Sequence, residues 1–210
     1  MSKYKKVLIL APHTDDGELG CGGTISRFIE GGHDVYYIAF SACKQSVLSH
    51  FPEDILTNEV KQATSVLGIK PENLILLDYE VRTFNYRRQE ILDDILKIKN
   101  AISPDIVFMP TLTDIHQDHF TIANEGVRAF KFSTIYCYEL PWNNFSFNSS
   151  CFFTLTKVQL NKKILAMAQY ESQAHRPYAN ENFITSLATV RGVQGGQKYA
   201  EAFELIRLIN

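Results

Sequence analysis

One stretch near the N-terminus reads Val7-Leu8-Ile9-Leu10-Ala11-Pro12-His13-Thr14-Asp15-Asp16-Gly17-Glu18. Its continuous apolar start predicts a β-strand that is buried on both faces, as strands of parallel sheets are. A histidine and three carboxylates follow this strand directly, although burying charge is costly unless the charge is paired or bound to a metal. The stretch therefore predicts a central strand that ends in a polar site.

The rest of the first 140 residues alternates apolar runs with helical patterns. Further strands are expected at residues 35–40, 74–77, 106–109 and 134–138. Helices are expected at residues 19–31, 53–67, 86–102 and 120–130. This alternation predicts an α/β fold with a mostly parallel sheet that is covered by helices on both faces.

The alternation stops near residue 140. A polar and aromatic loop at 141–150 is followed by a predicted strand at 152–156 and predicted helices at 158–170 and 182–190. The tail, 199–209, suits either a helix or a strand, and we favour a strand. The sequence shows no repeat, low-complexity tract or linker, so we expect a single domain over residues 1–210.

The composition excludes several classes of protein. The 210 residues are 45% hydrophobic with a formal net charge of −2, which gives no electrostatic footprint for nucleic acid or an anionic membrane. No apolar run approaches the ~20 residues of a membrane span, so no transmembrane segment is expected. The four cysteines are scattered without a C-x-x-C pair, which is typical of reduced thiols in a cytoplasmic protein.

A second polar cluster, Asp114-Ile115-His116-Gln117-Asp118-His119, follows the strand predicted at 106–109. Parallel strands bring their carboxyl ends to one edge of a sheet, where ligands bind in folds of this class. A lone H-x-x-H is more often structural than metal-binding, and an Asp-Asp pair alone suits a solvated turn. Because both clusters end strands of one sheet, we interpret them as one divalent-metal site.

The residue types suit a zinc site that hydrolyses an amide. Catalytic zinc takes three protein ligands and leaves one position open, and we assign the ligands to His13, Asp16 and His119. Asp15 is then available as the base that takes a proton from the attacking water. His116 is available to stabilise the oxyanion or protonate the leaving nitrogen, and Asp118 to orient an imidazole.

These motifs resemble those of the PIG-L/LmbE-like N-deacetylases. The segment Ala11–Thr24 is similar to the family's first signature, and His116–His119 is similar to its second, His-Pro-Asp-His. The segments Tyr170–Gln173, Arg191–Gly192 and Gly196–Glu204 are also similar to bacterial members. The resemblance runs nearly from end to end of the chain.

The resemblance implies a Rossmann-like three-layer fold and the roles already assigned to the site. It implies Zn²⁺ held by His13, Asp16 and His119, with Asp15 as base and His116 as the electrophilic or acid group. Asp118 would tune a histidine. The expected reaction removes the N-acetyl group of an amino sugar or sugar conjugate of GlcNAc type, releasing acetate and an amine. Several bacterial members form hexamers, so a homo-oligomer is also expected.

The chain departs from the family pattern at three positions. Thr14 replaces a proline, and Gly17 stands where a glutamate is expected, with Glu18 following. Relatives acting on thiol-pathway glucosaminides commonly have an arginine three residues before the glutamate corresponding to Glu59, where this chain has Leu56. That sugar contact is therefore not carried over.

Two questions about the substrate stay open at the level of sequence. Arg82, after the third predicted strand, suits a contact with a sugar hydroxyl or phosphate, or a solvated surface position. The alternatives to a deacetylase are a sugar-conjugate amidase that removes a larger acyl group, and a non-catalytic Rossmann-like protein that binds a nucleotide or sugar. Gly20-Cys21-Gly22-Gly23 is only a partial dinucleotide fingerprint, and we expect these glycines to permit close helix–sheet packing.

Overall fold

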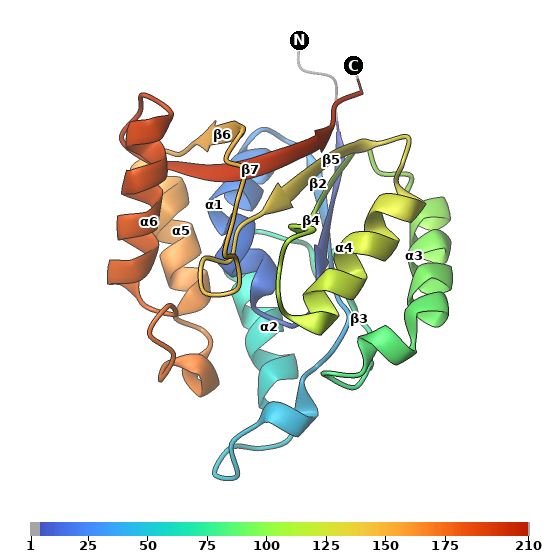
Figure 1. Ribbon diagram of the computed structural model, residues 1–210. Coiled ribbons are helices and arrows are strands. Elements are labelled where there is room, and N and C mark those ends of the chain that lie inside the picture. The colour runs from blue at the N-terminus through green and yellow to red at the C-terminus, as the bar shows by residue number, and fades with distance from the viewer. Residues whose placement is uncertain (1–4, 210) are drawn as a thin grey trace.

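The computed structural model describes residues 5–209, which form a seven-stranded sheet with helices on both faces (Figure 1). The strands are β1 (Lys6–Ala11), β2 (Asp34–Ala39), β3 (Leu74–Leu76), β4 (Ile106–Pro110), β5 (Thr134–Tyr138), β6 (Cys151–Thr154) and β7 (Ala200–Arg207). The helices are α1 (Asp16–Glu30), α2 (Ile55–Leu67), α3 (Arg88–Ile102), α4 (Gln117–Ala129), α5 (Lys157–Met167) and α6 (Glu181–Gln194).

The strand order is β3-β2-β1-β4-β5-β7-β6. The first five strands are parallel, whereas β7 is antiparallel to both β5 and β6. The chain builds outward from β1 through β2 to β3, then crosses to the other side of β1 to form β4 and β5. The order reverses between β1 and β4, and in open α/β sheets the ligand site lies at such a reversal.

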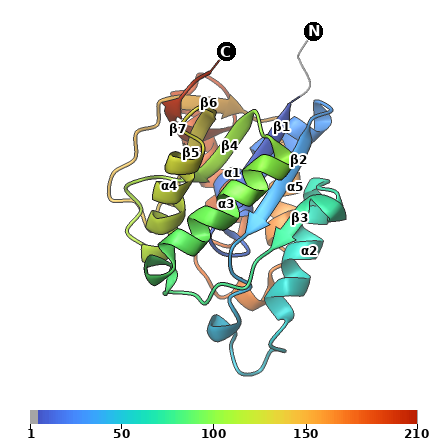
Figure 2. The same ribbon diagram turned by 90° about the vertical axis from the view of Figure 1, so that its right-hand side faces the viewer.

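The helices form two layers that bury the two faces of the sheet. In Figure 2, α3 and α4 lie in front of the sheet, with α1 and α5 behind it. The core on the first side contains residues of α3 and α4, and the core on the other contains residues of α1, α2, α5 and α6. This is the three-layer α/β fold that the sequence predicts.

Strand β1 contributes to both cores. Val7, Ile9 and Ala11 belong to the core under α1, α2 and α5, whereas Leu8 and Leu10 belong to the core under α3 and α4. All five are at most 1% exposed. Successive side chains of a strand point to opposite faces, so a strand between two helix layers needs an apolar residue at every position.

Helix α1 is kinked at Cys21, whose φ of −147° and ψ of 25° are not helical. The kink leaves main-chain N–H groups without a partner inside the helix, and a side chain from β7 accepts two of them. Oε1 of Glu201 accepts from the Gly23 N–H at 3.0 Å and Oε2 accepts from the Thr24 N–H at 2.7 Å. Nζ of Lys163, in α5, donates to the same carboxylate at 2.6 Å. This ion pair therefore ties α1, α5 and β7 together.

The glycines of α1 let the helix pack closely, as expected. A Cβ on Gly20 would overlap the ring of Tyr138 in β5, and one on Gly23 would overlap Leu155. The tail, for which we favoured a strand, forms β7. The helix predicted at 158–170 ends three residues early, at Met167, and residues 171–173 form a separate 3₁₀ turn.

Within residues 5–209, no helix combines the length and the apolar character that crossing a membrane requires.

Glu201→Ala should destabilise the fold by about 3 to 5 kcal/mol, because it leaves the Lys163 ammonium buried without its counter-charge. Both side chains are only 5% exposed. Urea unfolding followed by circular dichroism measures the change. The double variant Glu201→Ala/Lys163→Met removes both charges and should recover part of the loss. Equal unfolding midpoints for the native chain and the single variant would show that the pair contributes nothing.

Candidate active site

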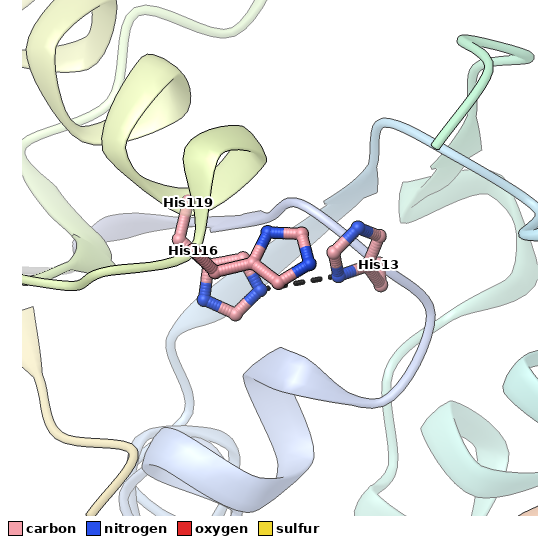
Figure 3. Close-up of side chains that lie close together, drawn as sticks. All are labelled: His13, His116 and His119. Atoms are coloured by element: carbon pink, nitrogen blue, oxygen red, sulfur yellow. Dashed lines mark hydrogen bonds between the residues drawn. The ribbon is translucent and has the colours of Figure 1, made fainter. Parts of the chain in front are cut away.

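The two polar clusters meet at the carboxyl ends of β1 and β4. These strands pair in parallel, with Ile9 opposite Phe108. His13 and Asp16 follow β1, and His119 lies in the first turn of α4, which follows β4. Residues 106 positions apart therefore lie in contact, and Figure 3 shows the rings of the three histidines of the site facing one another.

Three donor atoms form a nearly equilateral triangle. Nδ1 of His13 lies 3.1 Å from Oδ2 of Asp16. Nε2 of His119 lies 3.2 Å from the same oxygen and 3.1 Å from Nδ1 of His13. These are the three ligands assigned from the sequence. His116 lies beside them, since ring nitrogens of the three histidines are within 4.8 Å of one another.

The triangle has the size that a zinc ion needs. Zinc binds imidazole nitrogen and carboxylate oxygen at about 2.0–2.2 Å in tetrahedral geometry, which places its ligand atoms about 3.4 Å apart. Distances of 3.1–3.2 Å between the three donor atoms are close to this value. The donor set of two imidazoles and one carboxylate also suits a catalytic site, because it leaves a position open.

Each of the two histidines in the triangle has a carboxylate behind it. Nε2 of His13 lies 3.1 Å from Oδ2 of Asp118, and Nδ1 of His119 lies 2.9 Å from Oδ2 of Asp114. Both aspartates are buried. These contacts hold a proton on the outer nitrogen and orient the inner nitrogen of each ring toward the triangle, where it can bind a metal once it has lost its own proton. The structure therefore brings Asp118 beside a histidine, as the sequence analysis expects, and that histidine is His13.

Asp114 is a candidate site residue to which the sequence analysis gave no role. It stands within the quoted second cluster, but its position alone gives it no role. In the structure its Oδ1 also accepts from the His116 N–H at 2.8 Å, so one carboxylate fixes both histidines of the second cluster. The signal in the sequence was that the second cluster has two aspartates beside its two histidines.

His116 is the residue that precedes α4, and its side chain caps the helix. Nδ1 of His116 accepts a hydrogen bond from the Asp118 N–H at 3.2 Å. Burial, followed by the charges of His119 and His13, lowers the pKa of His116 to about 4. The ring is therefore neutral near pH 7 and has its single proton on Nε2, which makes that nitrogen a donor rather than a metal ligand.

The buried acids of the first cluster have opposite electrostatic environments. Burial tends to raise the pKa of Asp16, but the charges of His119 and His13 and their hydrogen bonds hold it well below its usual range. Asp15 has no such hydrogen bonds, and burial followed by the charge of Asp16 raises its pKa to about 6. Two adjacent carboxylates therefore differ, one suited to ligation and the other to proton transfer near neutral pH.

The three histidines and the two acids of the first cluster open into one cavity of about 340 Å³. Its lining includes His13, Asp15, Asp16, His116 and His119, together with residues from the loops at 41–52 and 141–150. Arg82 also lines it. Residues 171–178 form a further wall, which the sequence analysis did not identify.

The loop between β1 and α1 rests on two buried tyrosines. The hydroxyls of Tyr37 and Tyr170 donate to the Thr14 carbonyl oxygen at 2.9 and 2.7 Å, and both also contact the carboxyl group of Glu18. Burial raises the pKa of Glu18 to about 8 despite these contacts. Glu18, which had no assigned role, therefore supports the loop that presents the site.

The departure from the family motif at Gly17 has a steric cause. A Cβ at this position would overlap the ring of Tyr37, and the Gly17 N–H instead donates to the Tyr37 hydroxyl at 3.1 Å. Tyr37 thus takes the space that a side chain at position 17 would need. The departure leaves the donor triangle of His13, Asp16 and His119 in place.

The fold and the site together define an α/β protein with a donor set for a divalent metal at the carboxyl edge of its sheet. Residues 8–130, more than half of the chain, match the PIG-L family, which is described as GlcNAc-PI de-N-acetylase. The chain belongs to this family. Diacetylchitobiose deacetylase of Thermococcus kodakarensis is 24% identical over 226 residues, covering 96% of this chain and 83% of that protein.

Solved structures support the fold. N,N'-diacetylchitobiose deacetylase from Pyrococcus horikoshii superimposes with a TM-score of 0.77 at 23% identity, covering 97% of this chain and 84% of that one. The 4-carboxy-2-hydroxymuconate hydratase GalB from Pseudomonas putida KT2440 gives 0.75 at 19% identity, covering 98% of both chains. The same fold therefore supports different reactions, and the reaction must be argued from the site.

Zinc binding to the metal-free protein should release protons. Burial tends to lower the pKa of His119, but the charge of Asp16 and hydrogen bonds to Asp114 and Asp16 raise it to about 10. The proton is therefore present below about pH 10, and zinc must displace it, because only neutral imidazole binds a metal. The affinity for zinc should therefore fall about tenfold for each unit by which the pH is lowered, for each proton released.

Calorimetry at pH 7 in two buffers of different ionisation enthalpy measures this release. The apparent binding enthalpy should differ between the two buffers by at least the difference in their ionisation enthalpies, which corresponds to one proton released. His50→Gln changes an exposed histidine outside the site and should release the same number of protons. The same apparent enthalpy in both buffers would contradict the prediction.

Proposed function

We propose that this protein is a zinc-dependent N-deacetylase that removes the acetyl group from an N-acetylated amino sugar or sugar conjugate. The observation that supports it most is the donor triangle of His13, Asp16 and His119 beside Asp15 and His116 in one cavity. Membership of a family described as a GlcNAc-PI de-N-acetylase, and the diacetylchitobiose deacetylase relative, favour an N-acetyl sugar.

His13, Asp16 and His119 would hold the metal. A divalent cation there supplies positive charge that polarises the acetyl carbonyl and lowers the pKa of water to about 7. Asp118 and Asp114 orient the two imidazoles so that their inner nitrogens face the position of the metal. None of these side chains needs to move during the reaction, which favours preorganisation of the site.

The remaining side chains would perform the proton transfers. Asp15 takes one proton from the attacking water, whose oxygen forms a bond to the acetyl carbon. The carbonyl oxygen becomes negative and accepts a hydrogen bond from Nε2–H of His116. The proton on Asp15 then passes to the nitrogen as the C–N bond breaks, giving acetate and a free amine.

The cavity favours a small acyl group. Its volume of about 340 Å³ lies at the lower end of the range for ligand pockets, so it suits one sugar ring with an acetyl group better than a ring with a long acyl chain. An amidase for larger acyl groups is the alternative that this volume argues against. Acylated glucosamines of increasing chain length separate the two, since a deacetylase loses activity as the chain grows.

A screen for acetate release tests the proposal directly. Zinc-loaded protein should release acetate from N-acetylglucosamine or a conjugate of it, and protein treated with a chelator should lose this activity and regain it with added zinc. Saturable sugar binding with no acetate from any N-acetyl sugar would support the non-catalytic alternative. Activity that is unaffected by the chelator would contradict the metal-dependent mechanism.

Two substitutions separate metal binding from proton transfer. Asp15→Asn should keep bound zinc and lower kcat by about 10²- to 10⁴-fold, since a positioned base contributes that much. His119→Ala should lose the metal, as measured by elemental analysis. Asp93→Asn, on the exposed surface of α3, is the matched control and should retain both properties. Full activity of Asp15→Asn, or unchanged zinc in His119→Ala, would overturn the respective assignment.

A further inference from the structure

Two arginines line the cavity but take no part in the cluster of histidines and aspartates. These are Arg82 and Arg176. The Arg82 guanidinium donates to Oγ of Ser46 at 3.1 Å, and within residues 5–209 neither arginine forms an ion pair with a carboxylate. Other basic side chains of the chain do hold a carboxylate, among them Lys44, Arg87, Arg88, Arg128 and Arg191.

The first arginine is anchored to the reaction centre through its main chain. The Arg82 N–H donates to Oδ2 of Asp118 at 2.6 Å, and that oxygen is also the partner of His13. Arg82 has a φ of 68°, a left-handed conformation that a non-glycine residue adopts only when its surroundings hold it there. The start of this side chain is therefore fixed relative to the histidines.

The second arginine lies on a wall that is itself tied down. Glu59 of α2 is 3% exposed and accepts from the Ser172 N–H at 2.9 Å and from the Ser172 hydroxyl at 2.5 Å. Beyond Arg176, the ring of Tyr178 stacks on Trp142 at a centroid distance of 3.7 Å. Both ends of this segment are thus held, and Arg176 lies between them.

The charges of the cavity are unbalanced outside the reaction centre. The acidic residues among its lining are Asp15 and Asp16, and both have tasks in the proposed reaction. Both arginines are exposed and line the same cavity, so an anionic group that enters it can reach them, and guanidinium groups bind phosphate and carboxylate through paired hydrogen bonds. Leu56, another lining residue, is apolar and cannot supply such a contact.

We propose that the substrate carries a phosphate or carboxylate group in addition to its N-acetyl sugar, and that Arg82 and Arg176 bind this group. The inference rests on the proposed function, because it assumes that the N-acetyl group is at the histidines of the same cavity. It names the chemical class of the substrate, an anionic amino-sugar derivative, rather than a neutral sugar or disaccharide.

A substrate panel tests this class. The value of kcat/KM for acetate release is measured with N-acetylglucosamine, its 1-phosphate, its 6-phosphate and N-acetylmuramic acid, which carries a carboxylate. At least one anionic substrate should exceed the neutral sugar by about tenfold or more, because a charged hydrogen bond contributes about 10- to 100-fold. The phosphate and carboxylate members show which anion is recognised.

Arg82→Gln and Arg176→Gln should each lower the ratio of anionic to neutral kcat/KM by about tenfold. Arg207→Gln is the matched control, because Arg207 is exposed and pairs with Ile135 at the start of β5, the opposite edge of the sheet. This variant should keep the native ratio. A native ratio near one for every anionic member, or a ratio that survives both cavity substitutions, would overturn the inference.

Binding of the deacetylated products separates this inference from the proposed reaction. Calorimetry compares glucosamine with its 1-phosphate, its 6-phosphate and muramic acid in the native chain and the same variants. Tighter binding of an anionic product that depends on both arginines would support the inference even if no acetate is released. Acetate release at equal rates from neutral and anionic sugars, with equal product binding, would refute it while leaving the deacetylase in place.

Discussion

The parallel pairing of β1 with β4 is the constraint on which the site depends. It places the ends of two strands side by side although they are about 100 residues apart in the chain. The segment after each strand turns into a helix, α1 or α4, whose first turn contains site residues. The reversal of strand order at this point leaves the crevice between the two segments open, so the histidines face both each other and the cavity.

Compensation of buried charge is the second requirement of this arrangement. Asp16, Asp114 and Asp118 are buried, and each has a histidine as a partner. Isolated, these carboxylates would be costly to bury. Together with the histidines they form a compact group of alternating charge. The same contacts therefore offset the cost of burying the carboxylates and orient the donor atoms.

The sequence was sufficient for the fold because its strongest signals are local. The apolar run from Val7 to Leu10 specifies a central strand, and the tail with Phe203 forms the predicted strand. The boundary of α5 was less predictable, since residues 167–172 contain no glycine or proline to end a helix, and the contact of Ser172 with Glu59 is a tertiary one. That contact spans 113 residues, and no local pattern contains it.

The same distinction applies to the site. His13, Asp16 and His119 were accessible from sequence because each lies in a dense cluster beside a strand end. Asp114 was visible there too, but its role depends on which ring nitrogen it contacts. The wall with Arg176 and Tyr178 is contributed by a segment that reaches the cavity only through tertiary contacts with α2 and Trp142. The residue types of such a segment are those of an ordinary loop, so the sequence alone does not identify it as part of the site.

The overlap between position 17 and Tyr37 has a consequence for how this sequence can diverge. A side chain at position 17 and an aromatic ring at position 37 exclude each other in this backbone. Removing the ring first would leave the Thr14 carbonyl with one donor fewer and a void beneath the loop. Adding a side chain first would displace the ring. Neither order of single substitutions avoids a less stable intermediate, so we expect the two positions to change together.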